Sequence, residues 1–191
     1  IPDWGYAGSP LVLDGLVILN VGSAGTALDK VTGNILWKSG EDNAGYSTPL
    51  PVSQGNSTHV ILGSGKSWLA VDSKSGDKIW EFDWPTRYGV NAADPVISGG
   101  DIFISSGYNK GCALLKFDGS TPVAAWQNKE LKNQLGSSVL LDGHLYGFDG
   151  DTAASRSPFK CIEIATGMKK WEDVNIGPGA LMAADGKLIV L

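Results

Sequence analysis

The sequence is poor in the residues from which metal sites and disulfide frameworks are built. It has two cysteines and two histidines in 191 residues and no Cys-x-x-Cys motif. His59 and His144 lie far apart, so neither a Cys/His zinc site nor any other metal site is expected. Cys112 and Cys161 are either two small buried side chains or one disulfide, and their number alone does not decide between these alternatives.

Long hydrophobic runs and an excess of basic residues are also missing. No stretch of 18 apolar residues occurs, so no membrane span is predicted in this segment. Fifteen Lys and Arg stand against 20 Asp and Glu, a formal charge of −5. Since this balance offers no attraction to a phosphate backbone, nucleic acid is not an expected partner. The chain starts at Ile1 without an initiator Met and without a signal-peptide pattern, which fits either a processed mature protein or an excised fragment.

Glycine and tryptophan, in contrast, are abundant and periodic. The 26 glycines suit short strands joined by tight turns. The pattern A-x-D-x-x-[TS]-G-x-x-x-W occurs at 27–37 and 70–80, with a close relative at 161–171 and a looser copy at 114–126. The tryptophans that end these copies are spaced by 43, 46 and 45 residues; they are Trp37, Trp80, Trp126 and Trp171. The sequence is therefore a repeat array.

Each part of the pattern has a physical interpretation. Asp29 and Asp72 can accept hydrogen bonds from the amides of the turn that follows. Gly33, Gly76 and Gly167 supply the positive φ that closes the turn. The recurring tryptophan lies on the returning strand, where burial between neighbouring sheets best explains a large ring.

A second hairpin precedes each copy. Asp-Gly turns flanked by apolar strands occur at 14–15, 142–143 and 185–186, and longer turns occur at 53–59 and 98–101. Each unit therefore contains four strands in a meander, which predicts an all-β fold, a β-propeller of four-stranded antiparallel blades. A β-sandwich would not repeat the same turn-and-tryptophan pattern four times.

About four and a half blades are expected, within one partial propeller domain at 1–191. Their approximate ranges are 9–40, 47–83, 93–129, 137–174 and, for the start of a fifth, 178–191. Open propeller sides would expose unpaired apolar faces, so we expect a larger ring of 7–8 blades. The ring would be completed by the remainder of a longer polypeptide or by a second copy, and a fragment is the favoured expectation.

The repeated pattern resembles the tryptophan-docking repeat of quinoprotein-like (PQQ-like repeat) β-propellers. The stretches 45–49 and 105–115 are most similar to uncharacterised secreted bacterial PQQ-binding-like repeat proteins. The resemblance covers essentially the whole chain and implies a periplasmic or secreted location. It is specific for the fold and weak for the activity, because one fold hosts many functions.

The resemblance also sets out what an enzyme would need. Quinoprotein dehydrogenases hold pyrroloquinoline quinone (PQQ) between a tryptophan and a disulfide of adjacent cysteines, with Ca²⁺ and an aspartate base. This sequence has no Cys-Cys pair and no assignable Ca²⁺ ligands, although the glucose-type branch manages without those cysteines. No cofactor is therefore predicted; PQQ and Ca²⁺ belong only to the alternative of an alcohol or sugar dehydrogenase.

In a four-stranded meander, the turns of the first and last hairpins point to one face of the propeller, and the middle connections and the links between blades point to the other. The loops of this second face differ more between the repeats, so we expect candidate ligand-binding residues there. They are Tyr46, Lys66, Asn91, Asp94, Tyr108, Asn109, Lys110 and Arg156. Lys66, Lys110 and Arg156 share one type of position and could bind a carboxylate or quinone acid group, or could be ordinary exposed cations. Asp94 could be a base or a metal ligand, or could tie down its link through backbone amides. No catalytic residue is assigned.

The sequence thus favours a non-catalytic binding or scaffolding module of the bacterial periplasm or cell envelope. A PQQ-dependent oxidoreductase is the alternative, and the extracytoplasmic sensor of a larger receptor is a second alternative. Expected partners are envelope proteins or a small molecule.

Overall fold

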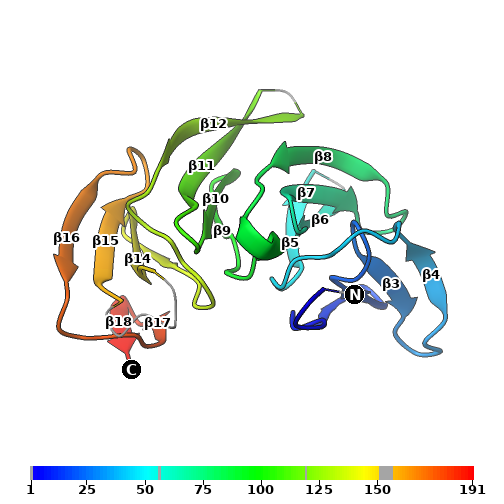
Figure 1. The fold of residues 1–191 in the computed structure, drawn as a ribbon. Coiled ribbons are helices and arrows are strands. Elements are labelled where there is room, and N and C mark those ends of the chain that lie inside the picture. The colour runs from blue at the N-terminus through cyan, green and yellow to red at the C-terminus, as the bar shows by residue number, and fades with distance from the viewer. Residues whose placement is uncertain (1, 56, 119, 151–156) are drawn as a thin grey trace. The chain divides into compact units, whose positions relative to one another are not determined.

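The computed structural model describes residues 2–55, 57–118, 120–150 and 157–191. The chain divides into two compact units, Ile1–Ala92 with Gly119–Pro122, and Ala93–Asp118 with Val123–Leu191. Both consist of antiparallel strands in which neighbours in sequence are neighbours in the sheet (Figure 1). The predicted all-β fold of four-stranded propeller blades is confirmed.

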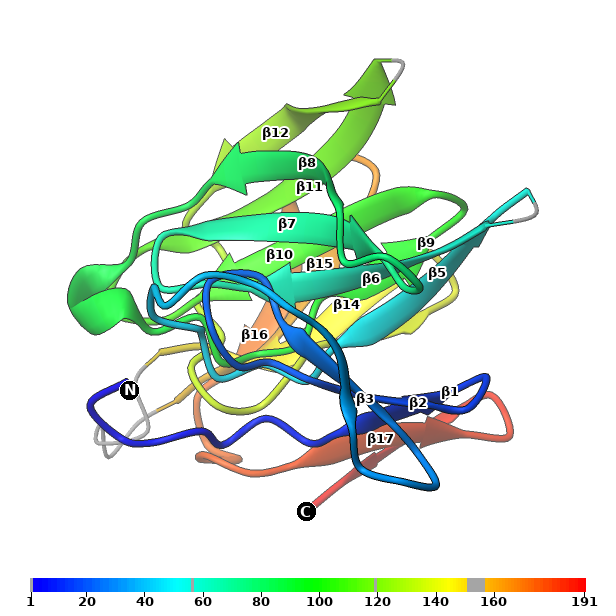
Figure 2. The same ribbon diagram turned by 90° about the vertical axis from the view of Figure 1, so that its right-hand side faces the viewer.

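The first unit contains two complete sheets, here called blades 1 and 2. Blade 1 comprises β1 (Leu11–Leu13), β2 (Leu16–Leu19), β3 (Thr26–Asp29) and β4 (Ile35–Lys38). Blade 2 comprises β5 (Leu50–Gln54), β6 (Ser57–Gly63), β7 (Ser67–Asp72) and β8 (Lys78–Asp83), which follow one another across the sheet in Figure 2. A short 3₁₀ turn, η1 (Arg87–Gly89), follows blade 2.

Blades 3 and 4 and one further hairpin form the second unit. Blade 3 comprises β9 (Val96–Ser98), β10 (Asp101–Ser106), β11 (Gly111–Asp118) and β12 (Thr121–Asn128), whose tip residues up to Pro122 are grouped with the first unit. Blade 4 comprises β13 (Val139–Leu141), β14 (His144–Phe148), β15 (Phe159–Glu163) and β16 (Lys169–Asp173). The last hairpin is β17 (Leu181–Ala184) and β18 (Lys187–Val190). Among the described residues, no helix has the length and apolar character needed to cross a bilayer.

The turn chemistry explains why the strands end where they do. In the Asp-Gly hairpins, Asp14, Asp142 and Asp185 adopt positive φ, as do the glycines that follow them, the combination that a two-residue hairpin turn requires. In the second type of turn, Asp29 Oδ1 accepts the backbone N–H of Thr32 at 2.7 Å. Asp72 Oδ1 accepts that of Ser75 at 2.9 Å.

The pairing between the third and fourth strands of a blade explains why the repeat begins with alanine and ends with tryptophan. Ala27 pairs with Trp37 and Ala70 with Trp80, and in blade 4 Cys161 takes the place of the alanine opposite Trp171. All three pairs adjoin a register shift on the inner strand. A small residue at this position leaves room beside the ring.

Within each unit, adjacent blades share an apolar core. Trp37 of blade 1 packs in one cluster with Val60, Leu62 and Val71 of blade 2. Its indole N–H donates to the Ser73 carbonyl at 3.0 Å. In the second unit, Trp126 donates in the same way to the Ile164 carbonyl at 2.9 Å. These tryptophans therefore contribute both apolar area and one hydrogen bond to the next blade's turn.

Candidate functional site

The first unit contains a cavity of about 720 Å³, here called the groove. Its walls come from the N-terminal segment, the link between blades 1 and 2, the β6–β7 turn, β8 and η1. The lining residues used below are Asp3, Asp42, Tyr46, Ser64, Lys66, Lys78, Glu81 and Tyr88. Two predicted candidates, Tyr46 and Lys66, thus line one cavity.

Lys66 forms an ion pair at the groove rather than standing free. Its Nζ lies 3.2 Å from Asp42 Oδ2, and both side chains are about two-thirds exposed. An exposed pair of this kind contributes little to stability, on the order of 0–1 kcal/mol. Lys66 is therefore accessible to a ligand, but a ligand anion would compete with Asp42.

One wall of the groove contains a chain of hydrogen bonds that superficially resembles a nucleophile and its base. Ser67 Oγ lies 2.7 Å from Ser64 Oγ and donates to Glu81 Oε1 at 2.7 Å. Lys78 Nζ lies 2.6 Å from Glu81 Oε2. Hydrogen bonds from Lys78 and then Ser67 hold the pKa of Glu81 below its ordinary value, which makes it a poor base. Because Ser67 is also fully buried, the chain ties the β6–β7 turn to β8 and is no catalytic centre.

Two tyrosines that line the groove, Tyr46 and Tyr88, both contact the ring of Trp4. The Trp4 ring lies 5.9 Å from that of Tyr46 at an interplanar angle of 62°, and 6.5 Å from that of Tyr88 at 84°. Edge-to-face packing of this kind is the favoured arrangement of aromatic pairs. These three residues are called the aromatic end below. Trp4 and Tyr88 were not among the predicted candidates.

Asn91 lies inside the first unit and not on its surface. Its side chain is fully buried, and its Nδ2 donates to the Ser64 and Trp84 carbonyls at 2.8 and 3.3 Å. Its own carbonyl accepts the backbone N–H of Tyr46 at 2.8 Å. Asn91 therefore holds the links that position Tyr46, a positioning role for which the sequence offers no signal except an amide in a link.

Four other predicted candidates lie in the second unit. Tyr108 and Asn109 both adopt positive φ in the β10–β11 turn, which Lys110 closes by donating its N–H to the Gly107 carbonyl. Burial, and then the neighbouring Lys129, lower the pKa of Lys110. Asp94 is half-buried, and its N–H donates to Ser137 Oγ at 2.8 Å. Arg156 lies outside the described residues.

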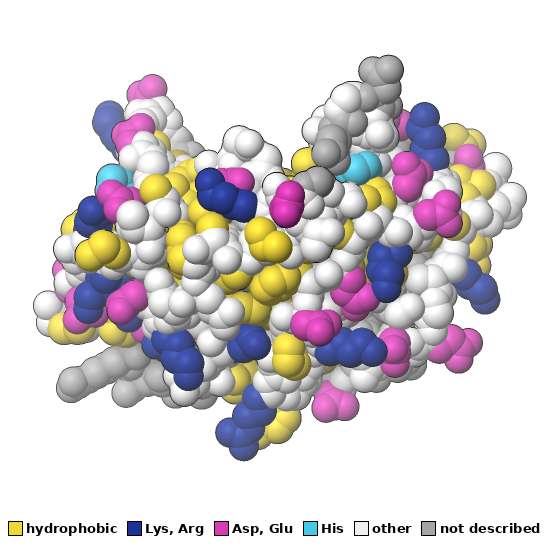
Figure 3. All heavy atoms as spheres, turned by 90° about the horizontal axis from the view of Figure 1, so that it is seen from above, with side chains coloured by type: hydrophobic (Ala, Val, Ile, Leu, Met, Phe, Trp, Pro, Cys, Tyr) yellow, Lys and Arg dark blue, Asp and Glu magenta, His cyan; other side chains and the backbone are white. Residues whose placement is uncertain are grey.

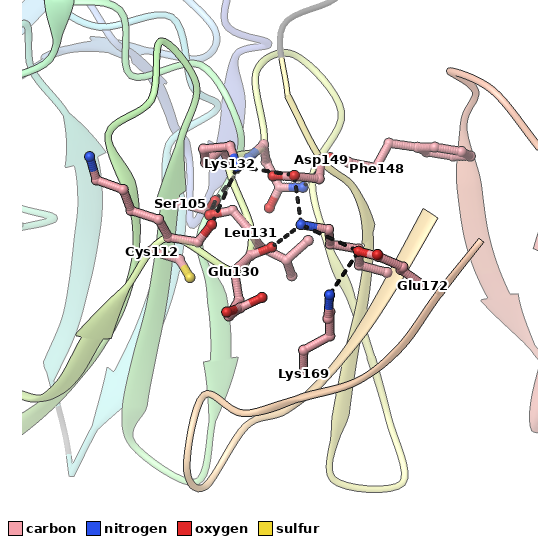
Figure 4. Close-up of polar contacts among 12 residues, drawn as sticks. Ser105, Cys112, Glu130, Leu131, Lys132, Phe148, Asp149, Lys169 and Glu172 are labelled. Atoms are coloured by element: carbon pink, nitrogen blue, oxygen red, sulfur yellow. Dashed lines mark hydrogen bonds and ion pairs between the residues drawn. The ribbon is translucent and has the colours of Figure 1, made fainter. Parts of the chain in front are cut away.

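The second unit also contains a buried charge cluster that the sequence did not indicate (Figure 4). Asp149 Oδ2 lies 2.7 Å from Lys160 Nζ and 3.1 Å from Lys132 Nζ. The Lys160 ammonium group also donates to the Glu130 carbonyl at 2.9 Å. The side chains of Asp149 and Lys160 are only 8% and 9% exposed. Such a pair matters for stability mainly because neither charge can be left alone in the interior.

Both cysteines are free thiols in this structure, so of the two alternatives the small buried side chain is the one observed. Cys112 Sγ donates to Asn128 Oδ1 at 3.2 Å. Burial raises the pKa of the Cys112 thiol to about 12 and also raises that of Cys161. Neither is a reactive nucleophile.

The residues that line the groove do not form a set that fits PQQ. Both lysines of the groove are already paired with carboxylates, and Asp3 adds a third acid, which disfavours a ligand bearing several carboxylates. Among the described residues, no group of three or more His, Cys, Asp or Glu could hold a metal ion.

Charged side chains of both signs are present at the surface, as the similar numbers of basic and acidic residues predict. On the face shown in Figure 3, basic and acidic side chains are intermixed over the described residues. Mixed charge of this kind supports solubility rather than long-range attraction of one class of polyion.

Known structures share the fold at low sequence identity. BamB from Moraxella catarrhalis is similar with a TM-score of 0.52 at 18% identity, covering 96% of this chain and 79% of that one. Quinohemoprotein alcohol dehydrogenase from Comamonas testosteroni has a TM-score of 0.63 at 14% identity, covering 97% and 39%. Hydrazine synthase from Kuenenia stuttgartiensis has a TM-score of 0.59 at 13% identity, covering 88% and 48%. This chain therefore spans less than half the length of the two enzymes.

Sequence comparison assigns the family. No curated protein sequence matches the chain. The family model described as outer membrane protein assembly factor BamB matches residues 4–173, which includes all four tryptophan-ended repeats. The chain therefore belongs to this family of PQQ-like repeat β-propellers.

Proposed function

We propose that this chain is a non-catalytic binding or scaffolding module of the bacterial periplasm or cell envelope, and that it binds a protein partner through the groove. The observation that carries the proposal is the groove itself, with the exposed aromatic end at its mouth. Aromatic residues are enriched in the centres of protein interfaces. The description of the family model, an outer membrane protein assembly factor, supports the same role.

Site-specific photo-crosslinking in the full-length protein tests this proposal. A benzophenone amino acid placed at Tyr88 is expected to give one discrete adduct in cells of the source organism, identified by mass spectrometry as an envelope protein. The matched control is Val31, which is 87% exposed in the β3–β4 turn of the same unit. Adducts of equal yield at both positions, or at neither, would contradict binding through the groove.

A second measurement separates this proposal from the oxidoreductase alternative, which the similarity to quinohemoprotein alcohol dehydrogenase keeps open. The full-length protein is incubated with PQQ and Ca²⁺ and assayed for dye reduction with alcohols and sugars. A binding module leaves the dye oxidised. Sustained turnover would replace the proposed function with that of a quinoprotein dehydrogenase.

A further inference from the structure

The rings at the mouth of the groove are unusually accessible for aromatic side chains. Trp4 is 61% and Tyr88 55% exposed. Because the two tyrosines contact Trp4 edge to face, the three rings support one another and leave ring surface open to solvent. The aromatic end is therefore an ordered apolar surface and not a set of isolated exposed side chains.

The backbone at Tyr88 adopts an uncommon conformation. Tyr88 has φ 65° and ψ 13°, in the left-handed region that bulky residues rarely adopt. The next residue, Gly89, also has positive φ, and a Cβ built onto it would be in ordinary contact with the backbone of Gly65. Strained residues of this kind concentrate at binding sites, where the surrounding structure holds them.

The charges around the aromatic end determine what kind of ligand fits it. Lys66 and Lys78 are each paired with a carboxylate within the groove. The exposed carboxylate of Asp3, in contrast, has no ion-pair or hydrogen-bond partner among the described residues. The mouth of the groove therefore combines open aromatic surface with two charged side chains: the exposed carboxylate of Asp3, next to Trp4 in the sequence, and the Arg87 guanidinium, which lies over the Tyr88 ring.

Aromatic faces attract cations, and this chain already provides an example. The Arg87 guanidinium lies over the Tyr88 ring, 4.8 Å from its centroid. Indole binds cations better than phenol does, and Trp4 is the most exposed of the three rings.

We propose that the aromatic end binds a basic side chain, lysine or arginine, of the protein partner, with Trp4 contacting the cation and Asp3 pairing with it. This inference rests on the proposed function and specifies the chemistry of the partner. It fails independently of the proposed function, because a crosslinked envelope protein could contact the groove without presenting a cation to Trp4.

The test uses the full-length protein labelled with 5-fluorotryptophan, and fluorine NMR. The Trp4 resonance is assigned by its loss in Trp4→Phe. The probes are N-acetyl-arginine amide and its citrulline analogue, which is nearly isosteric but uncharged. We expect the arginine probe to shift the Trp4 resonance with a dissociation constant at least about fivefold lower than that of the citrulline probe. The resonance of Trp171, a half-exposed tryptophan of the second unit, should not move.

Asp3→Asn supplies the second measurement, since Asp3 is exposed and its replacement is expected to leave the fold intact. The arginine probe should bind this variant about threefold more weakly and with less dependence on salt concentration. Equal affinity of both probes, or no shift of the Trp4 resonance with either, overturns the proposal. A shift produced by chitotriose but not by the arginine probe also overturns it, in favour of a glycan ligand.

Discussion

At the scale of single residues, Lys160 has the clearest energetic consequence. Its ammonium group is buried against Asp149, and Asp149 Oδ1 has no hydrogen-bond partner within the described structure. Replacing Lys160 with methionine therefore removes the shorter of the two ion pairs of this buried carboxylate and leaves it only Lys132, whose Nζ lies 3.1 Å away. We expect Lys160→Met to lower the free energy of unfolding by about 3 kcal/mol in urea denaturation.

The exposed pair of Lys66 and Asp42 provides the control. Lys66→Met removes a salt bridge of similar kind from a site about two-thirds exposed, so its cost should be under about 1 kcal/mol. Equal costs for the two variants would show that Lys132 or solvent compensates the charge of Asp149. The double variant Lys160→Met, Asp149→Leu should recover much of the lost stability, because it removes both buried charges.

The two cysteines lead to a chemical prediction. Burial raises the pKa of the Cys112 thiol to about 12, so its thiolate is scarcely populated at pH 8. Native protein should alkylate very slowly with iodoacetamide. After unfolding without a reductant, both thiols should be labelled, as counted by intact mass. An unfolded protein that takes up no label would instead contain a disulfide.

At the scale of the element, the β7–β8 turn shows how the repeat glycines differ in importance. Gly33 and Gly76 have nearly the same φ, 74° and 76°. A Cβ at Gly76 would lie 2.6 Å from Trp37 Cδ2, whereas one at Gly33 would have nothing within 4 Å. Gly33→Ala should therefore cost about 1 kcal/mol for backbone strain alone. Gly76→Ala should cost about 1–3 kcal/mol more, because it also overpacks the ring.

Calorimetry of the two variants measures this difference. If both substitutions cost the same, the Trp37 ring moves aside without loss, and its contact with the turn contributes little. A larger cost at Gly76 would show that the glycine serves the neighbouring blade as well as its own turn.

The same turn predicts an effect of pH. Hydrogen bonds from the backbone of Ser75 and then Lys74 lower the pKa of Asp72 from its ordinary value of 3.8. A carboxylate with a depressed pKa in the folded state stabilises the protein above its unfolded pKa, and this contribution is lost as the pH falls through the folded pKa. Wild type should therefore lose more stability than Asp72→Asn between about pH 5 and about pH 3. Parallel pH profiles of unfolding in urea would contradict this assignment.

The strands and turns were predictable because the information that specifies them is local. Asp29 and Gly33, or Asp142 and Gly143, specify a turn within a few residues, and the structure contains these turns. The groove was only partly predictable. Tyr46 was identified from its link, but Trp4 and Tyr88 are 84 residues apart in the chain, and only the tertiary fold brings them together.

Buried polar groups were the other feature that the sequence concealed. Asn91, Lys132 and Lys160 look like ordinary surface residues of links and strands, and a single sequence carries no sign of the partners that bury them. Asn91 was therefore assigned to a binding face, while the structure uses its amide to hold two carbonyls of the first unit. Polar residues of long links need the tertiary structure before a role can be assigned.

At the scale of the whole molecule, the four repeat tryptophans are not equivalent. Trp37 is 9% exposed and donates to the Ser73 carbonyl, whereas Trp171 is 44% exposed and contacts Tyr146 and Phe159 of its own blade. Trp37→Ala should therefore cost about 3–5 kcal/mol, the range for removing a buried large ring. Trp171→Ala should cost clearly less in this chain.

Thermal melts of the two variants provide the comparison. A similar loss at both positions would indicate that Trp171 is covered in solution, by further residues of the protein or by another copy of it. Since both residues occupy the same place in the repeat, the difference isolates the contribution of the neighbouring blade.

The register shifts beside Trp37, Trp80 and Trp171 have a consequence for behaviour in concentrated solution. Outer strands such as β4, β8 and β16 have an unpaired edge, which could nucleate cross-β aggregation. An irregularity one residue from the tryptophan position interrupts the regular ladder and increases the local twist. A straight strand of another molecule therefore pairs poorly with this twisted edge. We therefore expect the repeat to resist fibril formation through the same irregularity that positions its tryptophan.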